Sequence, residues 1–178
     1  MDTITELLKR DPLRQKALKA VAELTLPQCY LAAGFVRNLV WDHLHHKSVP
    51  TPLNDVDVIY FDTEECDSER YLQYEKALRS RMPELNWQVR NQAKMHTRNG
   101  DLPYTSSVDA MSFWPEKETA VGVRMNEAGG YELVSAFGVD SLFNLNITHN
   151  TKRTLTVFEQ RVATKNWLVQ WPKLEVRS

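Results

Sequence analysis

Two aspartates, Asp55 and Asp57, are the residues of this sequence best suited to bind a metal ion. They open the segment 55–61 (Asp-Val-Asp-Val-Ile-Tyr-Phe), whose β-branched and aromatic residues predict a strand. Side chains of a strand alternate between its faces, so both carboxylates are expected on one face. A divalent cation held by oxygen ligands, Mg²⁺ or Mn²⁺, would offset their mutual repulsion. The alternative is an exposed edge strand whose acids are simply solvated.

An anion-binding turn is predicted upstream of this pair. Gly34 falls between an apolar run at 29–33, which predicts a buried strand, and a helical pattern at 35–46. A glycine at such a turn lets backbone amides approach a ligand, and the helix N-terminus favours negative charge. An anion site beside paired carboxylates is what a nucleoside triphosphate with Mg²⁺ requires, because metal ions that bridge phosphate oxygens stabilise an in-line displacement.

The elements that must position these residues alternate between helices and short strands. Asp11 and Pro12 have the residue types of a helix N-cap and a first helical position. The acidic segment 62–69 is expected to begin a helix that runs to about residue 81. The remaining predictions are helices at 3–9, 106–113, 139–145 and 158–171, strands at 87–91 and 146–148, and a hairpin formed by 119–125 and 131–136. This order predicts a mixed α/β (α+β) fold, one small mixed sheet with packed helices, in a single domain over residues 1–178.

Composition excludes several classes of protein. With 178 residues, 42% hydrophobic and 25% charged, the chain is neither disordered, collagen-like nor a disulfide miniprotein. Its net charge of −1 lacks the positive field of a typical nucleic-acid binder. Two cysteines without metal spacing predict free thiols in a reducing compartment. No apolar run spans a membrane, and the acidic N-terminus differs from a signal peptide, so we expect a soluble cytoplasmic protein without a membrane partner.

Two segments carry local positive charge despite this balance. Residues 86–100 hold three cations and no acid, and residues 151–178 hold six cations and two acids. Either segment is a candidate for facing phosphates or an acceptor molecule. The alternative is a basic face that is merely solvated.

The two motifs together resemble those of the DNA polymerase beta nucleotidyltransferase superfamily. The segment 33–38 (Ala-Gly-Phe-Val-Arg-Asn) is similar to the Gly-Gly-x-Val-Arg-Asp turn in the head domains of CCA-adding enzymes and poly(A) polymerases. The whole chain also resembles a bacterial family of uncharacterised small nucleotidyltransferase-like proteins, notably at 87–96, 106–115, 119–124 and 158–172. This resemblance implies a nucleotidyltransferase (polymerase beta-like) fold.

The resemblance assigns roles residue by residue. Asp55 and Asp57 match the metal-binding pair of the superfamily, and Gly34 and Arg37 match the phosphate-binding turn, where a guanidinium meets phosphate oxygens bidentately. Asn38 replaces the aspartate of the motif and remains a candidate for phosphate binding. A phenylalanine at position 35 replaces the second glycine or serine, which opposes close contact between backbone and phosphate.

The resemblance also implies a third carboxylate, which activates the acceptor hydroxyl. The predicted strand 87–91 offers no acid, and Asp109 is the nearest candidate. Its alternative role is in a capping box with Ser106. Within the matching segment 87–96, Asn91 and Lys94 are further candidates for contacts with the nucleotide.

These residues favour a metal-dependent nucleotidyltransferase that moves a nucleoside monophosphate from an NTP to an unknown hydroxyl and releases pyrophosphate. The alternatives are a catalytically inactive nucleotide-binding or regulatory module on the same fold, and an interaction domain that binds no nucleotide. CCA-adding enzymes use further helical domains to hold tRNA, and this sequence ends at Ser178. Together with the net charge, this favours a small molecule or a protein over tRNA as acceptor.

Overall fold

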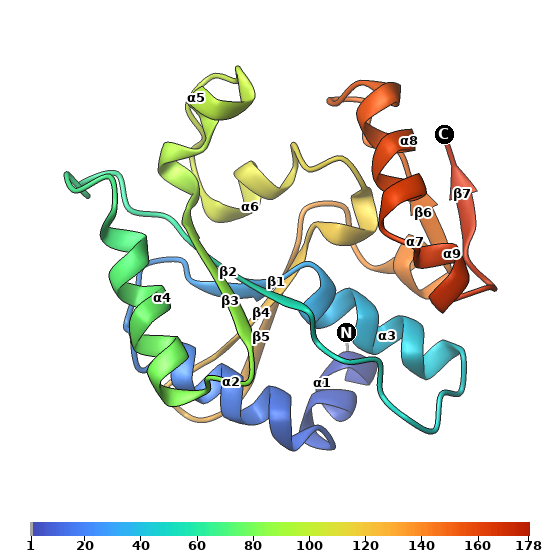
Figure 1. Cartoon of the computed structure of the whole chain (residues 1–178), viewed down its shortest axis with the longest axis horizontal. Helices are drawn as coiled ribbons and strands as arrows, with labels where there is room; N and C mark the ends of the chain where they lie inside the picture. The colour runs from blue at the N-terminus through green and yellow to red at the C-terminus, as the bar shows by residue number, and fades with distance from the viewer. Residues whose placement is uncertain (1) are drawn as a thin grey trace.

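A five-stranded mixed sheet forms the centre of the computed structural model, which describes residues 2–178 (Figure 1). Its strand order is β3-β2-β1-β4-β5, with β2 and β3 parallel and the other neighbours antiparallel. A separate pair of parallel strands, β6 and β7, lies near the C-terminus. The strands are β1 (Tyr30–Ala32), β2 (Asp55–Tyr60), β3 (Asn86–Asn91), β4 (Val121–Met125), β5 (Tyr131–Ser135), β6 (Asn146–Thr148) and β7 (Glu175–Arg177).

The helices cover both faces of the sheet. In Figure 1, α1, α2 and α4 lie below the sheet, whereas α5, α6 and α8 stand above it. The α-helices are α1 (Asp2–Lys9), α2 (Pro12–Ala22), α3 (Gly34–Leu44), α4 (Arg70–Arg81), α5 (His96–Asn99), α6 (Ser107–Met111), α7 (Asp140–Phe143), α8 (Leu155–Thr164) and α9 (Trp167–Gln170). Two short 3₁₀-helices are η1 (Gln92–Lys94) and η2 (Lys117–Thr119). The expected mixed sheet with packed helices is confirmed.

Strand β2 separates the main core from the opposite face of the sheet. Val56, Val58 and Tyr60 are fully buried in the larger core, together with apolar side chains of α1 to α4. Ile59 points the other way and packs in a smaller cluster with Met111. Because the side chains alternate, the two aspartates of β2 lie on the Ile59 face. The alternation of side chains therefore buries one face of β2 in the main core and leaves its carboxylates on the face toward α6.

Local capping signals place two of the predicted helix starts correctly. The carboxylate of Asp11 accepts a hydrogen bond from the backbone N–H of Arg14 at 2.9 Å, and Pro12 is the first residue of α2. The hydroxyl of Ser106 accepts from the N–H of Asp109 at 2.9 Å and caps α6. Both helices therefore begin where a side-chain oxygen satisfies an amide that the helix leaves free.

Two helix predictions were wrong in their extent. The single closing helix at 158–171 is instead α8 and α9, separated by Asn166 at φ 57°. Asparagine tolerates this left-handed conformation, and it turns the chain between two amphipathic segments of similar period. The acidic segment 62–69 does not begin a helix, because the carboxylates of Asp62 and Asp67 accept from amides two residues ahead and close turns. The sequence analysis did not predict strand β7.

The cysteines are free thiols, Cys29 buried and Cys66 exposed. Burial raises the pKa of the Cys29 thiol to about 12, so this group stays protonated near neutral pH. None of the helices within residues 2–178 combines the length and the apolar character needed to cross a membrane.

Candidate functional site

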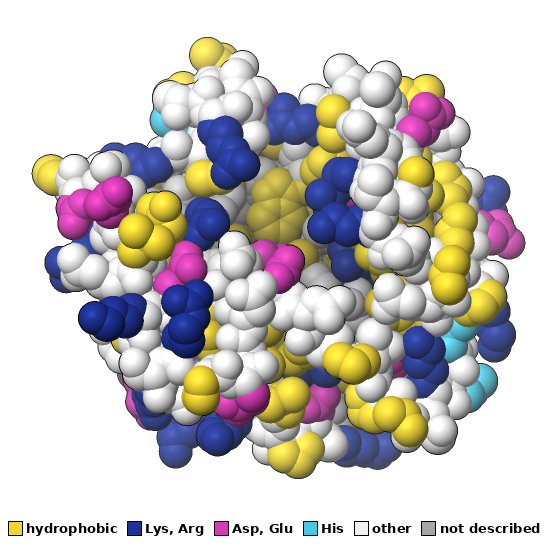
Figure 2. Space-filling model, viewed as in Figure 1, with side chains coloured by type: hydrophobic (Ala, Val, Ile, Leu, Met, Phe, Trp, Pro, Cys, Tyr) yellow, Lys and Arg dark blue, Asp and Glu magenta, His cyan; other side chains and the backbone are white. Residues whose placement is uncertain are grey.

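A cavity of about 450 Å³ opens on the face of the sheet that carries the two aspartates. Figure 2 shows this hollow at the centre of the molecule, with an apolar floor, Lys and Arg side chains along one wall and acidic side chains at the rim. Its walls are formed by the start of α3, the loop 51–54, β2, β3 with η1, α5 and the residue before it, the loop after α6, η2 and the segment from α8 to α9. The charged side chains that line it are Arg37, Asp55, Asp57, Arg90, Arg161 and Lys165.

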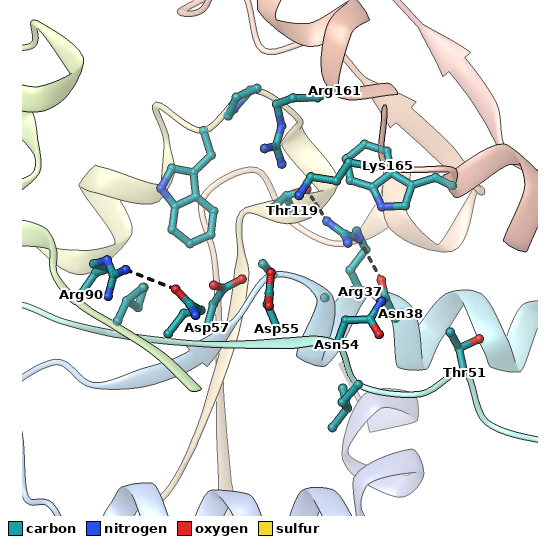
Figure 3. Close-up of a pocket in the computed structure, with 18 of the residues that line it drawn as sticks. Arg37, Asn38, Thr51, Asn54, Asp55, Asp57, Arg90, Thr119, Arg161 and Lys165 are labelled. Carbon is teal, nitrogen blue, oxygen red and sulfur yellow. Dashed lines mark hydrogen bonds between the residues drawn. The ribbon is translucent and has the colours of Figure 1, made fainter. Parts of the chain in front are cut away.

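The carboxylates of Asp55 and Asp57 both point into this cavity from β2 (Figure 3). Asp55 is exposed and accepts a hydrogen bond from the side-chain amide of Asn86, its partner in β3. Asp57 is half-buried. Burial raises the pKa of Asp57, the charge of Asp55 raises it further, and Arg37 lowers it in part. Negative charge at this pair is thus incompletely compensated by the chain itself, as expected for a cation site.

The start of α3 faces the same cavity. Ala33 has φ 57°, and its N–H donates to the carbonyl of Val121 in β4, so the sheet holds this strained turn in place. A Cβ added to Gly34 would lie 3.1 Å from Nδ2 of Asn38 and 3.4 Å from Nη2 of Arg37. Glycine therefore keeps the first turn of the helix open, with amides that have no partner within the helix.

The phenylalanine at position 35 does not obstruct this turn. Its side chain is fully buried in the main core, and the guanidinium of Arg14 packs on its ring and donates to its carbonyl at 2.8 Å. The departure from the second glycine of the motif therefore places no side chain in the cavity.

Arg37 is a buried cation that lacks an acidic partner. Only 6% of the residue is exposed, and its guanidinium lies between the rings of Trp41 and Trp167, 4.8 and 4.7 Å from their centroids. It donates to the side chains of Asn38 at 3.1 Å and Thr119 at 2.7 Å. Burial lowers the pKa of Arg37 to about 10, so the group is charged at neutral pH. Within residues 2–178 no carboxylate lies within 4.0 Å of it.

Two further cations reach the cavity from the C-terminal part of the chain. Arg161 and Lys165 are four residues apart at the end of α8 and therefore share a face. Arg161 pairs with the buried Glu116, whereas Lys165 forms no ion pair with any described residue. Figure 3 shows Lys165 and Arg37 pointing toward the same space above the aspartates. The sequence analysis covered Arg161 and Lys165 only as part of the basic segment 151–178.

The opposite wall is electrically balanced. Arg90 of β3 lines the cavity (Figure 3), but it donates to Glu75 at 2.7 Å and to Oε1 of Gln88 at 3.2 Å. Thr119, which the sequence analysis did not name as a site residue, connects Arg37 to Glu116, the partner of Arg161. Its hydroxyl accepts from Arg37 and donates to Glu116 at 3.0 Å. The contact between Arg37 and Thr119 joins residues more than eighty positions apart, so no local sequence pattern predicts it.

Three residues proposed from the sequence lie elsewhere. Asn91 is buried and bonds the backbone of Asp62 through both its amide atoms, at 3.0 and 2.8 Å. The ammonium of Lys94 donates to the carbonyl of Thr63 at 3.2 Å. The carboxylate of Asp109 accepts from the N–H of Thr105 at 2.9 Å, in the capping arrangement of α6. None of the three lines the cavity, and residues 2–178 hold no group of three or more potential metal-binding side chains.

Known proteins with this architecture define its class. An NMR structure described as revealing a CCA-adding enzyme head domain is 34% identical, with a TM-score of 0.87, over 100% of this chain and 96% of that one. A CCA-adding enzyme in complex with CTP has the same fold at 14% identity, with a TM-score of 0.62. The match covers 98% of this chain but only 43% of that enzyme. The fold is thus that of a nucleotidyltransferase head domain.

A nucleotidyltransferase family model matches residues 19–176, and the chain belongs to this family. The recognition made from the motifs of β2 and the start of α3 is therefore confirmed. No curated protein matches the sequence significantly. Family membership supports nucleotidyl transfer in general terms.

Proposed function

We propose that the protein transfers a nucleoside monophosphate from an NTP to a hydroxyl group, with a divalent metal ion held by Asp55 and Asp57. The observation that carries this proposal is the meeting of three features in one cavity: a carboxylate pair on one strand face, an open helix start at Gly34, and cations without acidic partners. The carboxylate pair suits the metal ion, and the helix start and the cations suit the phosphates.

The donor set suits Mg²⁺ or Mn²⁺. Both aspartates present hard oxygen atoms, and Mg²⁺ is commonly held by one or two carboxylates together with phosphate oxygens and water. A bound metal ion would polarise the α-phosphate and neutralise charge that develops during transfer. Burial and the neighbouring charge of Asp55 both raise the pKa of Asp57, and a bound cation would offset both effects.

The triphosphate would lie between the start of α3 and the end of α8. The free amides near Gly34 and the charged groups of Arg37 and Lys165 surround this part of the cavity, with the amide of Asn38 beside Arg37. Arg161 adds charge but shares it with Glu116. In the reaction, the hydroxyl oxygen of the acceptor bonds to the α-phosphorus and the bond to pyrophosphate breaks, with both oxygens in line.

For the acceptor we propose a small molecule or a protein segment rather than tRNA. The cations that line the cavity point inward, toward the proposed phosphates, and the wall at Arg90 is neutralised by Glu75. A tRNA acceptor would call for a continuous basic surface outside the cavity, and the net charge of the chain is −1.

A catalytically inactive nucleotide-binding module is the second candidate. One observation favours it: among the described residues, the only carboxylates that line the cavity are Asp55 and Asp57, and Asp109 caps α6 instead. A reaction without a third carboxylate has to pass the proton of the acceptor hydroxyl to the metal-binding pair or to water. Release of pyrophosphate in the presence of candidate acceptors separates the two functions, because only the catalyst produces it.

The first test is thermal unfolding with each of the four NTPs, with and without Mg²⁺. A ligand at one hundred times its Kd stabilises the native state by about 2.7 kcal/mol, which is roughly 5–10 °C for a chain of this size. We expect such a shift for at least one NTP, dependent on Mg²⁺ and absent in Asp57→Asn. The variant Glu84→Gln, which alters an exposed acid outside the cavity, should retain it. No shift with any NTP at millimolar concentration would refute nucleotide binding by the free protein.

A further inference from the structure

Three tryptophans line the cavity, and one of them, Trp114, stacks with no other ring or cation among residues 2–178. Trp167 packs against Trp41, Arg37 and Arg161, and Trp171 packs against Trp41 and Lys47. Trp114 is half-buried and packs against the small apolar cluster that contains Ile59 and Met111, but it forms no aromatic ring pair and no cation–π contact with residues 2–178. An indole ring left open inside a cavity is a surface on which a flat ligand stacks.

Hydrogen bonds from Asn150 hold the backbone around Trp114. Asn150 is 2% exposed, and its side-chain amide donates to the carbonyls of Ser112 at 2.7 Å and of Trp114 at 2.8 Å. Its own N–H donates to the carbonyl of Pro115 at 2.9 Å. The N–H of Trp114 also donates to Met111 at 3.0 Å. This loop is therefore held in one conformation, and the ring is positioned before a ligand arrives.

An unpaired amide accompanies the ring. Gln92, in η1, is 5% exposed and lines the same cavity, yet its side chain has no hydrogen-bond partner within the described chain. The amide of Gln92 is not among the enclosed polar atoms that lack a partner, so it opens to the cavity, where a glutamine offers both a donor and an acceptor. These two groups match the mixed donor and acceptor edge of a nucleobase.

The geometry points to Trp114 as the stacking platform for the base of the bound nucleotide, with Gln92 contacting the edge of that base. This inference rests on the proposed function, because the base is tethered to the phosphates and must fall on a wall of the same cavity. The wall of Arg37 and Lys165 is cationic and suits the phosphates. The opposite wall, where Arg90 is neutralised by Glu75 and the ring of Trp114 stacks with no other ring, suits the base.

The test compares two ligands that share phosphates but differ in the base. Binding of each NTP and of inorganic tripolyphosphate, with Mg²⁺, is measured by calorimetry on the wild type and on Trp114→Leu, Trp114→Ala and Trp114→Phe. Loss of one stacking contact corresponds to a loss of affinity of about 5- to 150-fold. We expect this loss for the NTP in the Leu and Ala variants, little loss in Phe, and unchanged binding of tripolyphosphate throughout.

Controls separate the platform from the phosphate site. Phe137→Ala removes an aromatic ring outside the cavity and should change neither ligand. Gln92→Met, which keeps the volume but removes the amide, should reduce the discrimination among the four NTPs. If Trp114→Leu leaves NTP binding intact, or weakens tripolyphosphate equally, the base platform is refuted while the proposed function stands. If the wild type binds neither ligand, the proposed function fails and this inference fails with it.

Discussion

At the scale of single residues, the site depends on where positive charge is left unpaired. Two of the cations that line the cavity have a nearby carboxylate, Arg90 with Glu75 and Arg161 with Glu116. Arg37 and Lys165 line the cavity without such a partner among the described residues. A cation without a carboxylate partner can donate to a phosphate oxygen without first breaking an ion pair, so these two residues carry the electrostatic part of the proposed binding.

We expect Lys165→Ala to weaken NTP binding by about tenfold, the equivalent of about 1.4 kcal/mol for one charged hydrogen bond at an accessible site. The loss should shrink as salt concentration rises, because the side chain is exposed and its charge is screened. Titration calorimetry at two ionic strengths measures both effects. Lys173→Ala, in the same basic segment but outside the cavity, is the matched control. Equal losses in the two variants would indicate a general effect of net charge.

The residues of the site that were predictable are those that local rules define. The period of a strand places Asp55 and Asp57 on one face, and a glycine between a strand and a helix marks the open turn at Gly34. Thr119 and Trp114 enter the cavity through contacts between elements distant in sequence, and such contacts leave no local signature. Asn91 was misplaced because its amide satisfies the backbone of a neighbouring loop.

At the scale of elements, the same contrast appears. The sequence predicted α2 from its N-cap and β2 from its β-branched and aromatic residues, but it did not predict the break between α8 and α9. That break depends on the left-handed conformation of Asn166, which lets Trp167 reach Trp41 on α3. Tertiary packing therefore selects a conformation that the helical pattern of 158–171 conceals.

An ion pair joins the two elements that flank the cavity. Arg153, just before α8, donates to Asp101, just after α5, and the hydroxyl of Tyr104 also donates to this carboxylate. The two side chains of the pair are only 18% and 12% exposed. The hydrogen bond from Arg153 holds the pKa of Asp101 below its ordinary value of 3.8. The charged form of Asp101 is therefore favoured in the native state.

We expect Asp101→Asn to lower the free energy of unfolding by about 1.5–3 kcal/mol, as for a hydrogen-bonded charge of low exposure. Because the native pKa lies below 3.8, this contribution is complete above that pH and disappears as pH falls through the native pKa. Urea unfolding of both proteins from pH 7 to pH 2 measures it. Glu132→Gln, which breaks the exposed pair with Arg124, should cost less than about 1 kcal/mol. A difference between wild type and Asp101→Asn that persists unchanged at pH 2 would contradict this account.

At the scale of the whole molecule, the cavity joins the N-terminal half of the sheet to the C-terminal segment that contains α8 and α9. Strand β2 supplies the carboxylates, the start of α3 supplies the open turn, and the end of α8 supplies two cations. The C-terminal segment is fastened to α3 by aromatic contacts of Trp41 with Trp167 and Trp171, and by the indole N–H of Trp171, which donates to Asp42 at 2.8 Å. Binding of the proposed nucleotide would therefore be coupled to the docking of this segment.

We therefore expect an NTP with Mg²⁺ to slow hydrogen exchange in two regions far apart in sequence, 33–38 and 155–171. The slowing is limited to about 100-fold at one hundred times the Kd, since only openings that release the ligand are suppressed. The tip of the β4–β5 hairpin at 126–130 lies outside the cavity and serves as the internal control. Protection confined to 33–38 would mean that α8 is not part of the phosphate site. Protection of both regions in wild type, with the C-terminal effect reduced in Lys165→Ala, would identify α8 as the element through which the C-terminal segment senses the nucleotide.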